Sequence, residues 1–293
     1  MAYELYIGDR TYSTWSMRGW LMFAAFDIPV KTHMVGLYGG TMKADLAHLA
    51  PARLVPVMTT NGNVVQDTLA MAETLNEENP DAGLYPKDRA QRALARSLVM
   101  EMHSGFGALR TDCGMNLEHS WNGFPASDAV KADIARIEYL WSMAFELSAS
   151  DGWLFGEYSL TDVFYAPVAA RIAGYGLKVG SQAQTYVDRH LNHPLFRQWR
   201  AMGLTKTYET KHYRVRGTEA PWPGPVTLHA KLAQGPSENA ACPYSGDPVT
   251  DFLEIDGRTF GFCNPFCRDK TIHDPAAWPK FMAIYGLMDQ THQ

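Results

Sequence analysis

The chain has 293 residues, more than one ordinary domain, and this length favours about two domains with a small appendage. Hydrophobic residues make up 46% of the chain and charged residues 19%, as in globular rather than disordered proteins. The formal charge of −5 argues against nucleic acid or an anionic membrane as a partner, and no apolar run approaches the roughly 18 residues of a membrane span.

The N-terminus and the cysteines bear on the compartment. Residues 1–7 contain no basic segment followed by a long apolar stretch, so we expect an unexported, cytoplasmic protein. Cys113 stands alone, whereas Cys242, Cys263 and Cys267 cluster near the end of the chain. This distribution suits a reducing compartment and a metal site better than a disulfide framework.

Residues 1–80 predict a thioredoxin-like α/β domain, in the order strand, helix, strand, hairpin and helix. The hairpin is predicted across Asn61-Gly62, the strongest short hairpin signal. The expected strands are residues 3–8, 30–35, 57–60 and 63–65, and the expected helices are residues 16–26, about 43–49 and 68–77.

Residues 87–208 predict an all-helical domain. Apolar residues from Leu94 to Cys113 recur every three or four positions and form one continuous stripe, on which Cys113 is expected to be buried. Ser159 and Asp162 have the spacing of a capping box, and the helix after them is apolar on nearly all sides. Pro167 is expected to kink that helix, which should lie at the centre of the domain.

The last part of the chain divides into a linker and a small module. Residues 209–239 are rich in Pro, Gly and isolated charges and predict a linker or a surface extension. Residues 240–293 predict a small terminal module with a hairpin formed by residues 252–255 and 258–262.

Ser13 lies where the first strand gives way to the first helix. The N-terminus of a helix stabilises an anion such as a thiolate, and a Ser hydroxyl there can donate to it without ionising. A hydrogen bond to a charged group contributes about 1.5–3 kcal/mol, which lowers a thiol pKa by about one to two units. From its spacing alone, however, Ser13 is more often a plain helix cap.

The order of elements, the segment Tyr12 to Arg18, Val55-Pro56 and residues 67–70 together resemble the glutathione transferase family. Residues 92–97 and 101–106 are similar to the opening of the helical domain in a bacterial branch near the zeta class, and the resemblance covers roughly residues 3–205. It implies a thioredoxin-like domain followed by an all-α domain, and a cytoplasmic homodimer that binds glutathione.

The resemblance also implies the roles of individual residues. Ser13 matches the active-site serine that holds the glutathione thiolate, and Val55-Pro56 matches the Val before a cis-proline. Asp67 and Thr68 match the pair that receives the γ-glutamyl end of glutathione, although Asp67 can also be a helix N-cap. Two departures stand out: residues 53–54 are Arg-Leu where a small residue and Lys are usual, and Thr14 replaces a more common Ser.

Two further residues are candidates near the expected cleft. His103 lies within the first long helix, where a single histidine is more often a packing residue than a catalyst. Trp15 is a candidate for the wall of the second-substrate pocket, with packing as the alternative.

The terminal cysteines resemble YHS or TRASH-type modules, which are small, treble-clef-like metal-binding units. Cys242, Cys263 and Cys267 would supply three zinc ligands, and His273 is the nearest candidate for a fourth, with Asp269 or Asp274 behind it. The alternative is a metal-free module with packed or redox-sensitive thiols. A module this small needs a metal, or docking onto its neighbour, to be stable.

The resemblance therefore implies a glutathione transferase that activates glutathione for conjugation to a small electrophile, or uses it in isomerisation or dehalogenation. The alternative is a non-catalytic binding or regulatory protein that keeps the fold and uses the terminal module for metal or partner contact.

Overall fold

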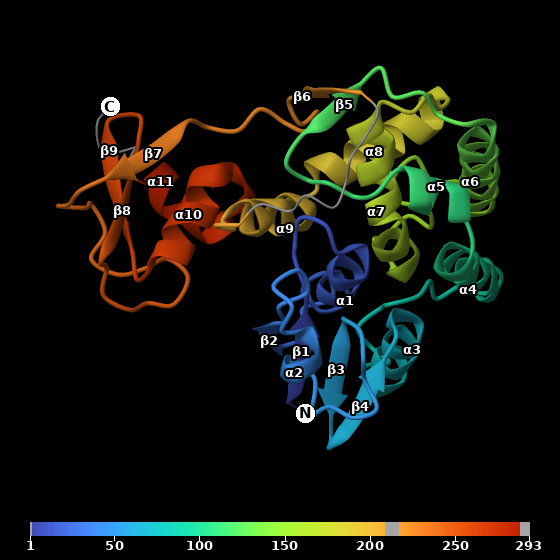
Figure 1. Ribbon diagram of the computed structural model, residues 1–293, viewed down its shortest axis with the longest axis horizontal. Helices are drawn as coiled ribbons and strands as arrows, with labels where there is room; N and C mark the ends of the chain where they lie inside the picture. The colour runs from blue at the N-terminus through green and yellow to red at the C-terminus, as the bar shows by residue number, and fades with distance from the viewer. Residues whose placement is uncertain (1, 209–216, 288–293) are drawn as a thin grey trace. The chain divides into compact units, whose positions relative to one another are not determined.

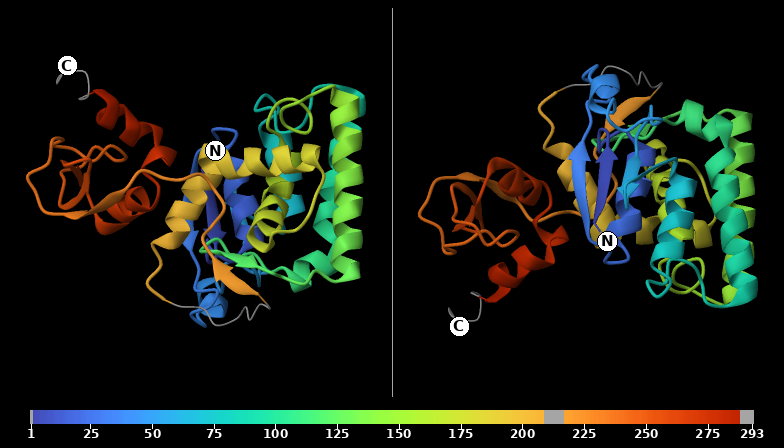
Figure 2. Two further views of the ribbon diagram at one scale, coloured as in Figure 1. Left: turned by 90° about the horizontal axis from the view of Figure 1, so that it is seen from above. Right: turned by 90° about the horizontal axis from the view of Figure 1, so that it is seen from below.

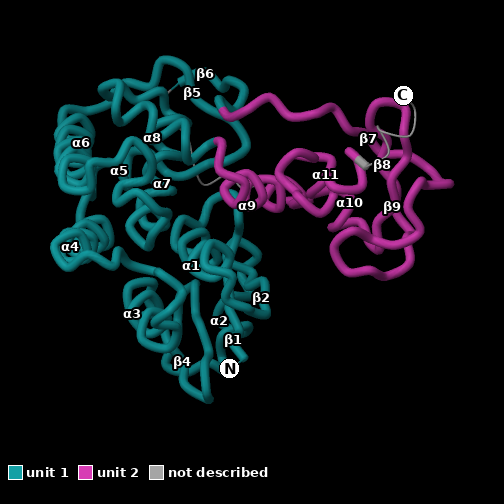
Figure 3. Tube along the Cα trace, turned by 180° about the vertical axis from the view of Figure 1, so that it is seen from behind, with its two compact units in different colours: residues 1–191, 210–223 teal, residues 192–209, 224–293 magenta. Residues whose placement is uncertain are grey.

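The computed structural model describes residues 2–208 and 217–287. The chain forms two compact units (Figure 3). The first contains residues 1–191 and 210–223, and the second contains residues 192–209 and 224–293.

The first unit begins with the predicted thioredoxin-like domain (Figure 1). Its four-stranded sheet has the order β2-β1-β3-β4, in which β1 pairs parallel with β2 and antiparallel with β3. The view from below shows these blue and cyan strands side by side (Figure 2). The elements are β1 (Tyr3–Ile7), α1 (Thr14–Ala24), β2 (Val30–Met34), α2 (Met42–Asp45), β3 (Val57–Thr60), β4 (Asn63–Gln66) and α3 (Thr68–Glu78).

The local sequence explains the turns of this domain. The hairpin β3–β4 reverses at Asn61 and Gly62, which have φ values of 50° and 80°, conformations that Asn and Gly adopt more readily than other residues. One side of the sheet is closed by a buried apolar cluster that includes Val35, Leu46 and Val57. The peptide bond Val55-Pro56, directly before β3, is cis as expected.

The helical domain of the first unit contains α4 (Arg89–Ser104), α5 (Gly107–Asp112), α6 (Asp128–Ser148), α7 (Leu160–Tyr175) and α8 (Ser181–Asn192). The continuous apolar stripe up to Cys113 was expected on one helix, but the structure corrects this. The helix ends at its cap residue Gly105, where a Cβ would lie only 2.7 Å from the Glu101 carbonyl oxygen, and Phe106 takes a left-handed conformation with φ 56°. The stripe therefore bends with the chain and lies on two helices.

Other expectations for this domain are confirmed. Ser159 and Asp162 form the predicted capping box at the start of α7, and this helix is buried along nearly its whole length. Pro167 lies inside this one continuous helix, and the expected kink there stays a prediction. Cys113 is fully buried, and burial raises the pKa of its thiol to about 12.

The second unit starts earlier than the expected module. Helix α9 (Pro194–Leu204), expected in the helical domain, lies in this unit, where its Arg197 holds Asp274 through two contacts of 2.7 and 2.8 Å. The expected linker is divided as well. Its β6 (Thr218–Ala220) pairs with β5 (Ser120–Asn122) in the first unit, and its β7 (Ala230–Ala233) joins the terminal sheet.

The terminal sheet has the order β7-β8-β9, and its hairpin is the predicted one. The remaining elements are β8 (Asp251–Ile255), β9 (Arg258–Phe262), α10 (Pro265–His273), the short 3₁₀ helix Pro275–Ala277 and α11 (Pro279–Leu287). Phe260, Phe262 and Phe281 are fully buried and form the core of the module. Among the described residues, the structure contains no helix with the length and apolar character that crossing a bilayer requires.

Candidate functional site

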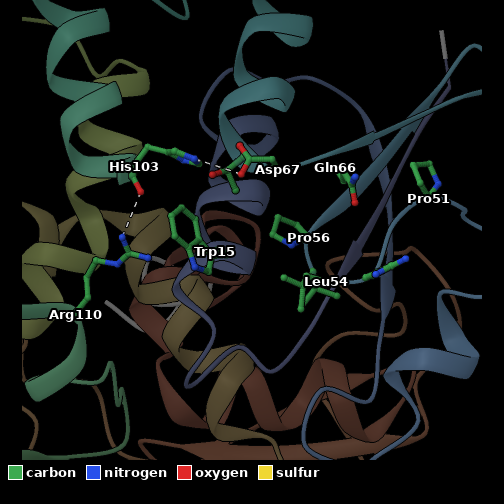
Figure 4. A pocket seen from close by; sticks show the side chains of 11 residues that line it. Trp15, Pro51, Leu54, Pro56, Gln66, Asp67, His103 and Arg110 are labelled. Carbon is green, nitrogen blue, oxygen red and sulfur yellow. Dashed lines mark hydrogen bonds and ion pairs between the residues drawn. The ribbon is translucent and has the colours of Figure 1, made fainter. Parts of the chain in front are cut away.

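An open cavity of about 910 Å³ lies in the first unit, between the thioredoxin-like domain and the helices α4 and α5 (Figure 4). The thioredoxin-like domain contributes the start of α1, the loop before β3 and the junction of β4 with α3. The helical domain contributes His103 and Arg110. Four of the five predicted glutathione-binding residues line this cavity, namely Val55, Pro56, Asp67 and Thr68.

Asp67 stands at the junction of β4 and α3 and caps α3. Its Oδ1 accepts a hydrogen bond of 2.8 Å from the Leu69 N–H, which is the N-cap contact that the sequence predicted. Its φ of 78° is unusual for a residue other than glycine, and such conformations cluster at ligand-binding positions. Asp67 is the only carboxylate among the residues that line the cavity.

Thr68 follows Asp67 and carries an unsatisfied hydroxyl. The residue is only 1% exposed, and its Oγ1 has no hydrogen-bond partner among the described residues. A buried hydroxyl without a partner costs about 1–3 kcal/mol of stability. Because Thr68 lines the cavity, this hydroxyl is suited to bond a polar group bound there.

The loop before β3 supplies a cation. Arg53 and Leu54 are the two residues that depart from the family pattern, and both are exposed and line the cavity next to Val55 and Pro56. A positive charge is thus present beside the cis-proline, carried by Arg53 two positions before Val55.

The opposite wall of the cavity is aromatic and basic. The guanidinium groups of Arg18 and Arg110 lie 4.6 and 5.1 Å from the centroid of the Trp15 ring. Arg18 does not line the cavity: it is 1% exposed, and its Nε donates to the Phe164 carbonyl at 3.0 Å. Burial, and then the nearby Arg171 and Arg110, hold the pKa of Arg18 well below the ordinary value for arginine. This wall favours a ligand that combines a π-system with negative charge.

Ser13 is placed as a helix cap and does not line the cavity. It is 7% exposed, its Oγ accepts from the Ser16 N–H at 3.2 Å, and it donates to the Ser16 Oγ at 2.8 Å. Trp15, two residues further on, is the residue of this turn that reaches the cavity. The expected contact of Ser13 with a thiolate stays a prediction.

His103 and Arg110 have clearer places in the site than the sequence indicated. The His103 Nε2 lies 3.3 Å from the Asp67 Oδ2, and the His103 ring stands edge-on to Trp15 at 5.2 Å. Arg110 belongs to α5, beyond the break in the stripe, so no spacing in the sequence connected it with Trp15. The segment 101–106, which the resemblance singled out, was the available signal for His103.

The second unit holds a separate cluster of thiols. The Sγ atoms of Cys242, Cys263 and Cys267 all lie within 4.8 Å of one another, and the three cysteines are free. Cys242 is in the turn before Asp247, Cys263 ends the hairpin and Cys267 is in the first turn of α10. The Cys263 Sγ accepts hydrogen bonds from Ser245 Oγ and Asn264 Nδ2.

The expected fourth ligand, His273, is not part of this cluster. It lies six residues after Cys267 on α10, and six residues turn a helix by about 600° and advance it by about 9 Å. The side chain therefore faces another way, where burial and then Arg200 lower its pKa. The candidates behind it are engaged too, because Asp269 pairs with Arg268 and Asp274 with Arg197.

The thiol environments differ in electrostatics. Burial opposes ionisation of Cys242, but backbone hydrogen bonds from Ser245 and Tyr244 outweigh it and lower the pKa of this thiol to about 7. Burial raises the pKa of Cys267 to about 12. Three clustered sulfur donors fit a thiophilic ion such as zinc, and among the described residues they leave one of its four usual positions open.

Comparisons of the sequence with known proteins find similarity in the first domain. The family model described as glutathione S-transferase, N-terminal domain, matches residues 12–78. A probable maleylacetoacetate isomerase of Caenorhabditis elegans is 35% identical over 105 residues, which cover 36% of this chain and 48% of that protein. A maleylacetoacetate isomerase of Dictyostelium discoideum is 27% identical over 133 residues, covering 45% and 59%. The chain thus spans about half the length of these curated relatives.

Comparisons of the structure establish the fold. A Burkholderia glutathione transferase homologue with bound glutathione superposes with a TM-score of 0.54 at 20% identity and covers 70% of this chain and 100% of its own. Glutathione transferase Omega 3C from Trametes versicolor gives a TM-score of 0.53 at 18% identity, covering 72% and 91%. A diazinon-metabolizing glutathione S-transferase of the silkworm Bombyx mori gives 0.55 at 14% identity, covering 70% and 98%.

Proposed function

Residues 12–78 form a glutathione S-transferase N-terminal domain on a glutathione transferase fold, and from this premise we propose that the protein is a glutathione-dependent enzyme. One observation carries the proposal. The unsatisfied hydroxyl of Thr68 and the carboxylate of Asp67 meet beside the cis peptide Val55-Pro56 in a single cavity. The Thr68 hydroxyl is a hydrogen-bond donor suited to the α-carboxylate of an amino acid, and the Asp67 carboxylate is suited to its ammonium group.

The binding roles follow from the chemistry of these side chains. The Thr68 hydroxyl donates to the γ-glutamyl carboxylate, and Asp67 holds the ammonium group. Arg53 attracts the carboxylate at the other end of the tripeptide. When bound, glutathione supplies a thiolate nucleophile, and the N-terminus of α1 is the part of the chain suited to hold its negative charge.

Ser13 is the proposed hydrogen-bond donor to that thiolate. Its hydroxyl now donates to Ser16 Oγ, so the role requires the Ser13 O–H to rotate toward the cavity. Such a donor lowers the pKa of the bound thiol by about one to two units.

A pair of substitutions tests this assignment. Ser13→Ala is expected to raise the pKa of bound glutathione by about one to two units, read from the pH profile of kcat/KM, and to lower kcat/KM about tenfold at neutral pH. Thr14→Ala removes the neighbouring hydroxyl and is the matched control. A loss confined to Thr14→Ala would transfer the role to Thr14, and retention of activity in both variants would remove a hydroxyl from the mechanism.

The second substrate is proposed to be a small, unsaturated electrophile that carries a carboxylate. The wall formed by Trp15 and Arg110 supports this, since it offers an aromatic ring and a positive charge. The curated relatives are maleylacetoacetate isomerases, which makes glutathione-dependent isomerisation the reaction class that we propose first. Conjugation and dehalogenation are the alternatives. The non-catalytic alternative is not favoured by these relatives.

Turnover assays decide among these reactions. We expect isomerisation of maleylacetoacetate that depends on added glutathione and falls at least tenfold in Arg110→Gln, because the substrate loses a charged contact worth about 1.5–3 kcal/mol. Glutathione-dependent turnover of uncharged electrophiles only would contradict the anionic substrate.

A homodimer is proposed from an exposed apolar stripe. Tyr139, Met143 and Leu147 recur every four residues on α6 and are 55%, 36% and 44% exposed, with Met100 of α4 50% exposed. Sedimentation analysis should show a dimer that Met143→Glu dissociates. Ala132→Glu, at another exposed position of α6, should not change the mass. A monomeric wild-type protein would contradict the proposal.

The terminal module is proposed to bind zinc through Cys242, Cys263 and Cys267. The three clustered sulfurs and the hydrogen bonds to Cys263 support this. Protein purified without chelator should contain about one zinc per chain, and Cys113→Ser should leave this unchanged. Less than about a tenth of an equivalent, with no uptake of added zinc, would argue for the metal-free alternative.

The four free cysteines also support the proposed cytoplasmic location.

A further inference from the structure

The two carboxylate oxygens of Asp67 are both engaged. Oδ1 accepts from the Leu69 N–H at 2.8 Å and thereby caps α3. Oδ2 lies 3.3 Å from the His103 Nε2, and Asp67 itself is 52% exposed. The oxygen that remains for a ligand ammonium therefore already has a partner, which comes from the helical domain (Figure 4).

The fold holds His103 in this place. His103 lies in the last turn of α4, and Gly105 caps the end of this helix. The Arg110 Nη1 donates to the carbonyl oxygens of His103 and Gly105, each at 3.3 Å. The His103 ring packs edge-on against Trp15 and tilted against Phe164, and its side chain is 19% exposed. The imidazole is thus directed at Asp67 by packing on two sides.

The polar surroundings of the ring are one-sided. The His103 Nδ1 is buried and has no hydrogen-bond partner among the described residues. Asp67, which contacts Nε2, is therefore the one described side chain that makes a polar contact with the ring nitrogens. The charged groups around the ring are the Asp67 carboxylate, the C-terminal end of α4 and Arg110, with Arg18 against the same Trp15 ring. On the ring's own helix, Glu101 is held by Arg136 of α6.

We propose that His103 occupies the ammonium position of Asp67 in the unliganded protein, and that a γ-glutamyl ligand must displace it. This inference rests on the proposed glutathione binding. The contact from His103 Nε2 to Asp67 Oδ2 breaks, and the ligand ammonium donates to Oδ2 instead. A protonated imidazole, left beside the ammonium and without its carboxylate, gives its proton to solvent. Ligand binding is therefore coupled to proton release, and His103 is a residue that sets affinity.

The coupling has a definite sign. A protonated imidazole holds the Asp67 carboxylate more strongly than a neutral one, so the dissociation constant should rise as the pH falls. The thiol of glutathione also releases a proton on binding, so the probe must lack it.

Calorimetry with S-methylglutathione tests the proposal. Titrations in two buffers of different ionisation enthalpy, repeated at several pH values, should show that the wild-type protein releases protons when it binds the ligand. His103→Gln keeps an N–H donor toward Asp67 and should release none. His119→Gln is the matched control, because His119 pairs with Glu219 and does not line the cavity. It should behave as the wild type.

A second ligand gives a test that needs no variant. An S-methylglutathione analogue without the α-amino group cannot compete for Asp67, so it should bind the wild-type protein more weakly and release no proton. Equal release with both ligands, or undiminished release from His103→Gln, would overturn the displacement. Tight S-methylglutathione binding with no proton release would overturn it as well, and would leave glutathione binding intact. If S-methylglutathione fails to bind at all, the proposed function itself falls.

Discussion

The cavity of the first unit and the thiol cluster of the second are built in opposite ways. The cavity gathers Trp15, Asp67 and His103 from three separate helices or their caps, and its polar atoms are left partly unsatisfied. The thiol cluster lies within 26 consecutive residues, and backbone and side-chain donors already surround two of its sulfurs. The first is a site that depends on how helices pack, and the second depends on one local turn and hairpin.

Because of this difference, the two sites should respond to different changes of condition. Ligand binding in the cavity should depend on the stability of the helical core, and that stability depends on pH through a buried carboxylate. The state of the thiol cluster should depend on the supply of metal. The first prediction below asks whether a change in the second unit leaves the cavity unaffected, and the others test the core and the cavity of the first unit.

The largest expected effect is loss of the metal. Cys267→Ser removes one of three clustered sulfurs and should reduce bound zinc from about one equivalent to below about a tenth, measured by elemental analysis. The affinity for S-methylglutathione should stay within about twofold, because the cavity takes no residue from the second unit. A comparable loss of glutathione affinity would show that the two sites are coupled.

The second prediction concerns the core under the cavity. Asp162 is fully buried in the capping box, and burial raises its pKa to about 6 despite hydrogen bonds from Tyr186 and Ser159. The folded chain keeps this proton to a higher pH than the unfolded chain, where the pKa is about 3.9. The contribution to stability is therefore full below about pH 4 and lost as the pH rises through about 6, a total of about 3 kcal/mol.

Denaturant unfolding at several pH values measures this effect. The free energy of unfolding of the first unit, compared between the wild type and Asp162→Asn, should show a slope between about pH 4 and about pH 6 in the wild type only. The variant lacks the titrating group and serves as the reference for every other carboxylate. Parallel pH profiles of the two proteins would contradict the raised pKa.

The third prediction asks whether the Thr68 hydroxyl contributes to ligand binding or to the stability of the protein. Thr68→Val replaces the unsatisfied hydroxyl with a methyl group of the same size, so the unliganded protein should be as stable or slightly more stable. The affinity for S-methylglutathione should fall about tenfold, which calorimetry reads directly. A loss of stability with unchanged affinity would mean that Thr68 has a structural partner and no ligand role.

The smallest expected effect is at Arg53. Its side chain is exposed, and interactions between exposed charges contribute about 0.2–1 kcal/mol. Arg53→Ala should therefore weaken S-methylglutathione binding by no more than about fivefold, and the difference should shrink as salt is added. An effect that is large and independent of salt would place Arg53 in close, desolvated contact with the ligand.

The sequence by itself determined the parts of this protein that rest on local chemistry. The hairpin at Asn61-Gly62, the cap at Asp67, the capping box at Ser159 and Asp162, and the buried Cys113 were all predictable, because turn conformation, orphan helix amides and apolar periodicity act within a few residues. The three thiols were predictable as a group for the same reason.

Only the tertiary structure decided the rest. The pairing of His103 with Asp67 joins residues 36 positions apart, and the contact of Arg110 with Trp15 depends on the break at Gly105, which a regular helical period conceals. His273 shows the converse, since proximity in the sequence suggested a ligand that the turn of α10 directs elsewhere. Side chains on different elements meet only when those elements pack, and packing is a property of the whole fold.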